Sequence, residues 1–254
     1  MSKNRSKPAP SSSGPLILYG RHPVMAAVCN RRRKINKILC TKENFEEIRN
    51  ACLKNDLSPG IVNMVDKKEI DRILPREAVH QGLAAYCQEL EEYTLDEICI
   101  IADELPRCHV LILDQVTDPQ NIGAIIRSCV AFDTLALILQ DKNAPLETGA
   151  MAKASAGTIE HLRICRVTNL SRAINQLKDA GFWTIGMDGY AQNYIDSIDK
   201  SGKIAIVMGS EGKGMRRLVE EACDSTVKLP ISEKVESLNV STAAAIALYE
   251  INKG

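Results

Sequence analysis

The chain has 254 residues, which is enough for one large domain or for two modest domains that each bury a core. Hydrophobic residues make up 45% of the sequence and charged residues 25%, as is ordinary for a soluble globular protein. No apolar run reaches the roughly 20 residues that a membrane span needs. The basic N-terminus continues into Pro and Ser residues, which excludes a secretory signal, so we expect a cytoplasmic protein.

The charges balance, with 32 basic and 32 acidic side chains, but their distribution is uneven. Residues 1–42 hold ten Lys or Arg residues and no acid, whereas residues 88–106 hold seven acids and no Lys or Arg. A basic front end of this kind is suited to contact phosphate groups. The nine cysteines form no Cys-x-x-Cys pair and the four histidines do not cluster with them, which predicts reduced thiols and no metal site.

The N-terminal third predicts a basic tail followed by a small mixed unit. Residues 1–14 are polar and rich in Pro and Ser, which predicts a disordered tail that either binds RNA or acts as a solubilising leader. Residues 15–90 alternate apolar strands and amphipathic helices, which indicates an αβ unit. Its strands are expected over 16–20, 35–40, 61–65 and 82–90, and its helices over 23–30, 43–55 and 67–74. The acidic residues 91–106 then predict a linker.

Residues 107–254 alternate strands and helices more strongly and predict an α/β fold. The strands are continuously apolar, which favours a parallel sheet covered on both faces. They are expected over 109–116, 135–139, 161–167, 182–189, 203–210 and 225–230. Helices are expected over 121–132, 147–157, 169–181, 214–224 and 237–253.

Ligands of open parallel sheets bind beyond the carboxyl ends of the strands. Three segments that follow expected strands carry unusual polar residues, and the first of them holds Asn121 and Arg127. Asp118 or Asn121 is suited to cap the following helix. Arg127 lies in an apolar stretch, where an arginine is costly unless it is paired or serves a ligand. The alternative is a structural salt bridge to Asp133 or Glu147.

Two later segments carry similar features. Residues 208–215, MGSEGKGM, hold three glycines that let the backbone approach a ligand closely. Their spacing matches neither the dinucleotide fingerprint nor the P-loop. Because Glu211 would repel a phosphate, the segment favours a cationic or hydroxylated ligand. A plain strand-to-helix turn is the alternative. Farther on, Ser237 and Asn239 flank Leu238 at the start of an Ala-rich helix, where simple capping is the alternative.

The order and spacing of these three segments resemble the three motifs of the SpoU (TrmH-like) class of the SPOUT superfamily, the RNA ribose 2′-O-methyltransferases. The resemblance continues through residues 142–170 and into LYGRHPVMAAV and HQGLAAYC of the N-terminal unit, so that it covers residues 16–252. The sequence is most similar to the guanosine-2′-O-methyltransferases of 23S ribosomal RNA.

The resemblance implies an S-adenosylmethionine-dependent enzyme with a C-terminal trefoil knot and an N-terminal RNA-binding domain. It also implies a homodimer whose active site is completed across the subunit interface. The cofactor contacts carried over from the family are Gly209, Leu229 and Leu238, and the catalytic and substrate positions are Asn121, Arg127, Glu211, Ser237 and Asn239. The family usually has glycine where this chain has Asp133 and Glu233.

Arg127 is the residue that the resemblance offers as the base. A guanidinium group keeps its proton at a pKa above about 12, so we expect it instead to grip a phosphate and lower the pKa of the hydroxyl electrostatically. Asn121, Ser237 and Asn239 would orient the ribose or phosphate, and Glu211 would position Arg127 or the substrate.

A run of four basic residues in the N-terminal unit is a candidate RNA contact. Phosphate groups are the expected partners of Arg31, Arg32, Arg33 and Lys34, and a solvated basic turn is the alternative. Three other functions remain open: a transfer-RNA ribose methyltransferase, a non-catalytic RNA-binding protein and, less favoured, a small-molecule nucleotide enzyme. The intact motif residues argue against the second, and the failed phosphate-loop spacing argues against the third.

Overall fold

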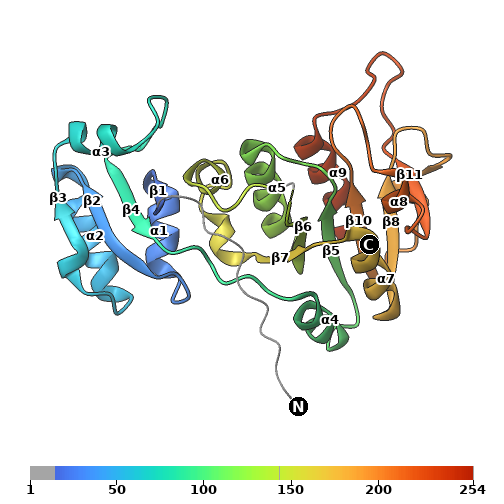
Figure 1. Cartoon of the computed structure of the whole chain (residues 1–254), viewed down its shortest axis with the longest axis horizontal. Coiled ribbons are helices and arrows are strands. Elements are labelled where there is room, and N and C mark those ends of the chain that lie inside the picture. The colour runs from blue at the N-terminus through green and yellow to red at the C-terminus, as the bar shows by residue number, and fades with distance from the viewer. Residues whose placement is uncertain (1–14, 143, 254) are drawn as a thin grey trace.

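Residues 15–142 and 144–253 are described by the computed structural model of the chain (Figure 1), in which they form two sheets with flanking helices. The expected basic tail, residues 1–14, lies outside the described residues. No helix within the described ranges is long and apolar enough to cross a membrane.

The smaller sheet has four strands in the order β1-β4-β2-β3. The alternating pattern of residues 15–90 predicted these four strands but not their order. Successive side chains of a strand point to opposite faces. Ile38 and Cys40 of β2 therefore pack with α1 and α2, whereas Leu39 between them packs with Ile70 of α3. The elements are β1 (Leu16–Tyr19), α1 (Arg21–Cys29), β2 (Ile35–Cys40), α2 (Lys42–Lys54), the 3-10 turn η1 (Pro59–Ile61), β3 (Val62–Met64), α3 (Lys67–Ile73) and β4 (Leu83–Cys87).

The larger sheet has seven strands in the order β7-β6-β5-β10-β8-β11-β9, and every neighbouring pair is parallel. This confirms the expected parallel α/β sheet. The strands are β5 (Cys108–Leu113), β6 (Ala136–Gln140), β7 (Arg163–Val167), β8 (Phe182–Met187), β9 (Asn193–Tyr194), β10 (Lys203–Met208) and β11 (Ser225–Lys228).

Helices pack on both faces of the larger sheet. One face packs with α5 and α9, and the other packs with α4 and α7. The helices are α4 (Leu95–Asp103), α5 (Pro119–Ala131), α6 (Gly149–Ala154), α7 (Leu170–Asp179), α8 (Arg217–Glu220) and α9 (Val240–Asn252), with short 3-10 turns η2 (Thr158–His161) and η3 (Ile195–Ser197).

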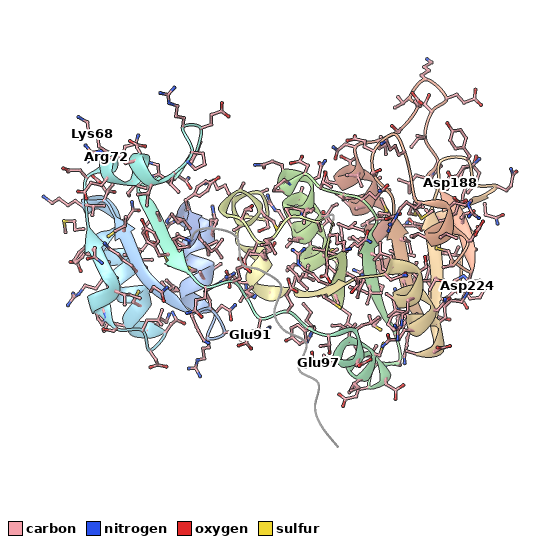
Figure 2. All side chains as sticks on the ribbon, viewed as in Figure 1. Lys68, Arg72, Glu91, Glu97, Asp188 and Asp224 are labelled. Atoms are coloured by element: carbon pink, nitrogen blue, oxygen red, sulfur yellow. The ribbon has the colours of Figure 1, made fainter. Side chains whose placement is uncertain are left out.

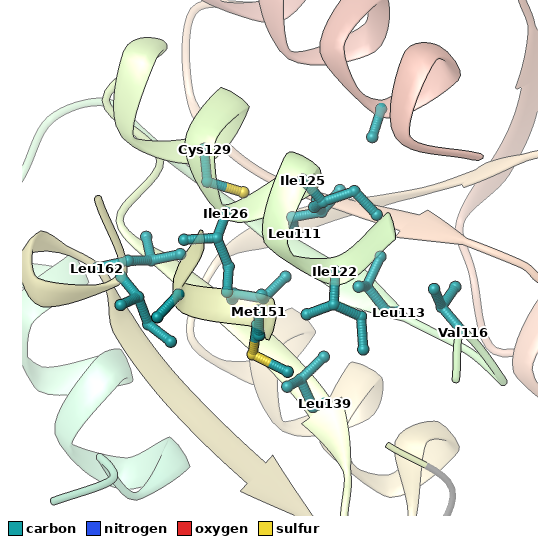
Figure 3. Packing of buried hydrophobic residues seen from close by; sticks show 14 of the residues in the cluster. Leu111, Leu113, Val116, Ile122, Ile125, Ile126, Cys129, Leu139, Met151 and Leu162 are labelled. Atoms are coloured by element: carbon teal, nitrogen blue, oxygen red, sulfur yellow. The ribbon is translucent and has the colours of Figure 1, made fainter. Parts of the chain in front are cut away.

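The sequence of α5 explains its start and its buried side. Asp118 caps the helix by accepting a hydrogen bond from the backbone N–H of Gln120, and Pro119 occupies the first helical position, where no donor is lost. Apolar residues then recur at helical spacing and face the sheet, as Figure 3 shows. They are Ile122, Ile125, Ile126 and Cys129.

Two expectations about elements were wrong. The acidic residues 91–106 are not a linker throughout, because residues 95–103 form α4, whose Leu95, Ile98 and Ala102 are buried against the sheet. A capping box between Thr94 and Glu97 starts this helix, and most of its acids face solvent. The helix expected over 214–224 is confined to α8, because the chain is still in a left-handed turn at Gly214, where φ is 66°.

Candidate active site

The carboxyl ends of β5, β6, β10, β8 and β11 meet at one edge of the larger sheet, because these strands are parallel. This edge is at the top of Figure 1, where the loops that follow β10 and β11 project. All three segments singled out in the sequence leave strands at this edge.

A hydrogen bond joins the first and third segments. Asn239 caps α9, since its Oδ1 accepts from the backbone N–H of Ser241 at 2.9 Å. Its Nδ2 donates to Oδ1 of Asn121 in the first turns of α5 at 3.1 Å. Two predicted site residues that are 118 positions apart therefore meet, and capping alone does not account for Asn239.

Arg127 is exposed on α5 and forms no hydrogen bond or ion pair with any described residue. The alternative of a salt bridge to Asp133 or Glu147 is therefore wrong, and Glu147 instead pairs with Arg33 at 2.6 Å. Six residues along a helix amount to about 9 Å and about 240° of rotation. Arg127 consequently does not join the Asn121–Asn239 pair within one chain, and its guanidinium group is available to a ligand.

The glycine-rich segment is a tight turn that needs its glycines. Ser210 and Gly214 exchange backbone hydrogen bonds, and Gly212 and Gly214 are left-handed with φ of 76° and 66°. A Cβ atom on Gly209 would lie 2.1 Å from the carbonyl carbon of Gly214, so only glycine permits this close approach. Glu211 is exposed in the turn and has no partner among the described residues.

Asp114 and Arg216 anchor this turn to the sheet, and sequence reasoning assigned neither of them a role. The Asp114 carboxylate is fully buried at the end of β5, and it accepts the backbone N–H and the Nε–H of Arg216, each at 2.8 Å. Arg216 also donates to Oε1 of Gln140 at the end of β6, at 2.9 Å. The available signal was a single acid directly after the apolar run 110–113, since a buried carboxylate needs donors.

The predicted cofactor contacts gather at the same edge. Gly209 follows β10, Leu229 follows β11 and is buried, and the half-buried Leu238 packs against the cluster that contains Leu229. This set combines main-chain groups with apolar side chains and includes no cation, which fits the adenosyl group and the positively charged sulfur of S-adenosylmethionine. Ser237 is exposed in the loop between β11 and α9 and has no partner among the described residues.

The four side chains of the basic run in the N-terminal unit have different environments. Arg33 was expected to contact RNA, but its side chain is buried between Glu147 and Glu160, so that prediction was wrong. Arg32 donates to the hydroxyl of Tyr93 and to the carbonyl of residue 91. Arg31 and Lys34 are exposed, and Arg31 lies 3.3 Å from Asp56 in an exposed ion pair.

Comparison with protein families gives matches over both sheets. A family model described as the SpoU rRNA Methylase family matches residues 109–249. A second, described as RNA 2′-O ribose methyltransferase substrate binding, matches residues 17–93.

Curated relatives match over most of their length. The protein named putative TrmH family tRNA/rRNA methyltransferase YacO from Bacillus subtilis (strain 168) is 39% identical over 221 residues, which cover 86% of this chain and 88% of the relative. A putative TrmH family tRNA/rRNA methyltransferase from Staphylococcus epidermidis is 37% identical over 93% of this chain and 94% of its own.

Solved structures share the fold of the chain. An AdoMet-bound rRNA methyltransferase from Sinorhizobium meliloti superposes with a TM-score of 0.76 at 21% identity, over 94% of this chain and 87% of that one. The SpoU methyltransferase AviRb from Streptomyces viridochromogenes, in complex with AdoMet, gives a TM-score of 0.76 at 22% identity, over 95% and 90%.

Proposed function

Because the chain belongs to the SpoU rRNA methylase family, as its motifs predicted, we propose that it methylates the ribose 2′-hydroxyl of a guanosine in 23S ribosomal RNA. It is an S-adenosylmethionine-dependent RNA methyltransferase of this family. The observation that carries the proposal is the hydrogen bond between Asn121 and Asn239, beside a turn held by Asp114. Arg127, the cation of the first motif, is left free for RNA.

The two units have separate roles in this proposal. Residues 15–90 bind the RNA and residues 107–254 carry out the transfer, in the cytoplasm. Supporting the first role is the match of residues 17–93 to the RNA 2′-O ribose methyltransferase substrate-binding model. Within the second unit, the segment that leads to α9 forms the trefoil knot, and α9 returns to pack against α5, where Phe132 and Tyr249 contact edge to face.

The active form is a homodimer in which Arg127 of one copy serves the Asn121–Asn239 pair of the other. Supporting this arrangement, Arg127 lies about 9 Å and about 120° around α5 from Asn121 and has no hydrogen bond to the pair in its own chain, so the pair lacks a bonded cation among the described residues. Ile246 and Tyr249 of α9 are 41% and 52% exposed and offer apolar area for such an interface.

When bound, S-adenosylmethionine supplies a methyl group on a positively charged sulfur, so that the O2′–methyl bond forms while the sulfur–methyl bond breaks and its electron pair stays on sulfur. Much of the rate comes from holding the hydroxyl in line with that methyl group. Asn121, Asn239 and Ser237 orient the ribose, and Glu211 positions Arg127 or the substrate. Arg127 binds the adjacent phosphate and favours the developing oxyanion, and because it keeps its own proton, the hydroxyl proton passes to water.

The test is methyl transfer from labelled S-adenosylmethionine to unmodified ribosomal RNA and transfer RNA, followed by nucleoside analysis. We expect label in 2′-O-methylguanosine of 23S RNA. Label in another 2′-O-methylnucleoside would reject the guanosine assignment, and label in transfer RNA alone would reject the ribosomal one. Binding of S-adenosylhomocysteine without transfer to either RNA would favour a non-catalytic RNA-binding protein.

A further inference from the structure

A buried cluster of three charges joins the two units of the chain. The Arg33 side chain donates to Oε1 of Glu147 at 2.6 Å and to Oε1 of Glu160 at 2.7 Å, and its exposed fraction is 0%. Arg33 lies in the turn before β2, whereas both carboxylates belong to the larger unit. Burial alone would lower the pKa of Arg33, but the hydrogen bonds and charges of the two carboxylates outweigh burial and raise it, so the guanidinium group stays charged.

The two units are closely packed around this cluster. A Cβ atom on Gly149 would lie 2.2 Å from the carbonyl oxygen of Ile17, and one on Gly157 would lie 2.9 Å from that of His22. Leu18 of β1 and Met151 of α6 belong to one continuous buried cluster. The two units are thus packed as one body.

The smaller unit carries free cations on the side of the candidate active site. Figure 2 shows Lys68 and Arg72 of α3 on the same side of the molecule as Asp188, which follows β8, whereas Glu91 lies on the opposite side. The basic run also lies on that opposite side, because Arg32 donates to the carbonyl of Glu91.

In residues 66–77 most of the acidic side chains are bonded within the unit, whereas the basic side chains are not. This segment holds four cations and four acids, but three of the acids are bonded within the unit: Asp66 and Glu69 form the capping box of α3, and Asp71 pairs with His80 at 3.0 Å. The four cations are exposed and form no hydrogen bond or ion pair with the described part of the chain. They are Lys67, Lys68, Arg72 and Arg76. These hydrogen bonds leave the carboxylates charged, so the segment as a whole is neutral; what it offers a phosphate backbone is four exposed cationic side chains that no ion pair within the described residues holds in place.

We propose that a folded RNA is held by this face of α3 and by the candidate active site at the same time, at a spacing fixed by Arg33. The inference rests on the proposed function and specifies its substrate as an RNA with enough rigid structure to reach both surfaces. Arg33 is a positioning residue: it touches no RNA, and it acts by keeping the RNA-binding unit in register with the site. A rigid spacing raises the effective concentration of the target ribose at the site once the RNA is bound.

The first experiment removes the buried contact of Arg33 with Glu147 and Glu160, called the clamp below. Arg33→Met is combined with Glu147→Gln and Glu160→Gln, so that no unpaired charge is left buried. Arg31→Met, the same substitution at an exposed position two residues away, is the matched control. We expect the triple variant to lose about tenfold in kcat/KM for a folded RNA through a higher KM, with a larger radius of gyration in X-ray scattering. Its affinity for S-adenosylhomocysteine should stay within about twofold, because those contacts lie in the other unit.

Unchanged scattering or unchanged kcat/KM in the triple variant would overturn the role of Arg33. If that variant does not fold, Glu147→Gln, which keeps the Arg33–Glu160 pair, should shift the same two quantities by less in the same direction. No shift there would also count against the clamp.

The second experiment compares RNA affinity for Lys68→Gln/Arg72→Gln with that for Arg31→Gln/Lys34→Gln, each removing two exposed charges. The α3 pair should weaken binding about fivefold or more and reduce its salt dependence. Arg31 and Lys34 were expected from the sequence to contact RNA, but they belong to the basic run on the opposite side of the molecule, so the second pair should weaken binding by less. Equal affinities for the two pairs would overturn the assignment of this face. If the protein methylates no RNA, the proposed function fails, whereas scattering and RNA affinity still test the spacing.

Discussion

The carboxylate of Asp114 binds both the main chain and the side chain of Arg216, 102 residues farther along the sequence. One oxygen accepts the backbone N–H and the other accepts the guanidinium group, each at 2.8 Å. Since Arg216 directly follows the glycine-rich segment, this pair sets where that segment sits relative to β5. The position of Gly209 and Glu211 therefore depends on Asp114, whose own backbone N–H donates to the carbonyl of Met208, directly before Gly209.

Asp114→Asn should loosen the glycine-rich turn. Its amide group has one oxygen in place of two, so one of the two Arg216 donors loses its acceptor. We expect a loss of about 2 kcal/mol in the free energy of unfolding and weaker binding of S-adenosylhomocysteine. Denaturant titration and calorimetry measure the two effects, with the exposed Asp179→Asn as control. Unchanged affinity in Asp114→Asn would show that the turn keeps its place without the carboxylate.

Asn239 is predicted to have two separable functions. Asn239→Ala removes both the cap of α9 and the bond to Asn121, and should cost about 1 kcal/mol of stability. Asn239→Ser keeps a good capping oxygen but cannot reach Asn121 with an amide, so its stability should change by less than about 0.5 kcal/mol. Methyl transfer should fall in both variants. Full activity of the serine variant would exclude a role for the amide pair in the reaction.

Arg127→Ala should abolish methyl transfer while leaving stability and S-adenosylhomocysteine affinity unchanged, because this side chain has no partner among the described residues. Arg172→Ala on α7 removes another exposed arginine as a control and should remain active. Retention of full activity by Arg127→Ala would reject its assignment.

Mixing subunits tests whether Arg127 acts across the proposed dimer. Equal amounts of Arg127→Ala and Asn239→Ala subunits that exchange freely give half heterodimers, each with one intact composite site, so about a quarter of the sites are restored. If Arg127 served its own chain, every site in the mixture would carry a defect and no activity would return.

Local patterns predicted most helices and strands and the three site segments, because periodicity and motif spacing are properties of neighbouring residues. They could not separate Arg33 from Arg31, which share a run and differ in burial only through the docking of the second unit. The Asp114–Arg216 pair could not be predicted either, since it joins distant segments whose residues match no local pattern. In α4, high acidity concealed an apolar stripe of three residues.

Asp133 stands at a position where the resemblance to the family led us to expect glycine. It follows the end of α5 with φ of 54°, a left-handed conformation that glycine adopts without strain. Asp133→Gly should therefore stabilise the protein by about 0.5 kcal/mol, the gain being reduced by the greater freedom of glycine in the unfolded chain. Thermal unfolding measures the change, and Asp179→Gly within a helix should destabilise it by comparison. A destabilised Asp133→Gly variant would contradict this account.

His109 should make the protein less stable in mild acid. It is buried in β5 with Nε2 3.1 Å from Oγ1 of Thr134, and burial, together with the charge of Arg107, lowers its pKa from 6.5 to about 4. The unfolded chain binds this proton more readily, so the stabilisation is complete above pH 6.5 and is lost as the pH falls towards 4. The loss amounts to about 2.5 kcal/mol near pH 4.5. His109→Gln keeps a polar side chain that does not titrate, and its unfolding free energy should fall less between about pH 7.5 and 4.5. Identical pH dependence in the two proteins would mean that His109 is protonated in the folded state as readily as in the unfolded one.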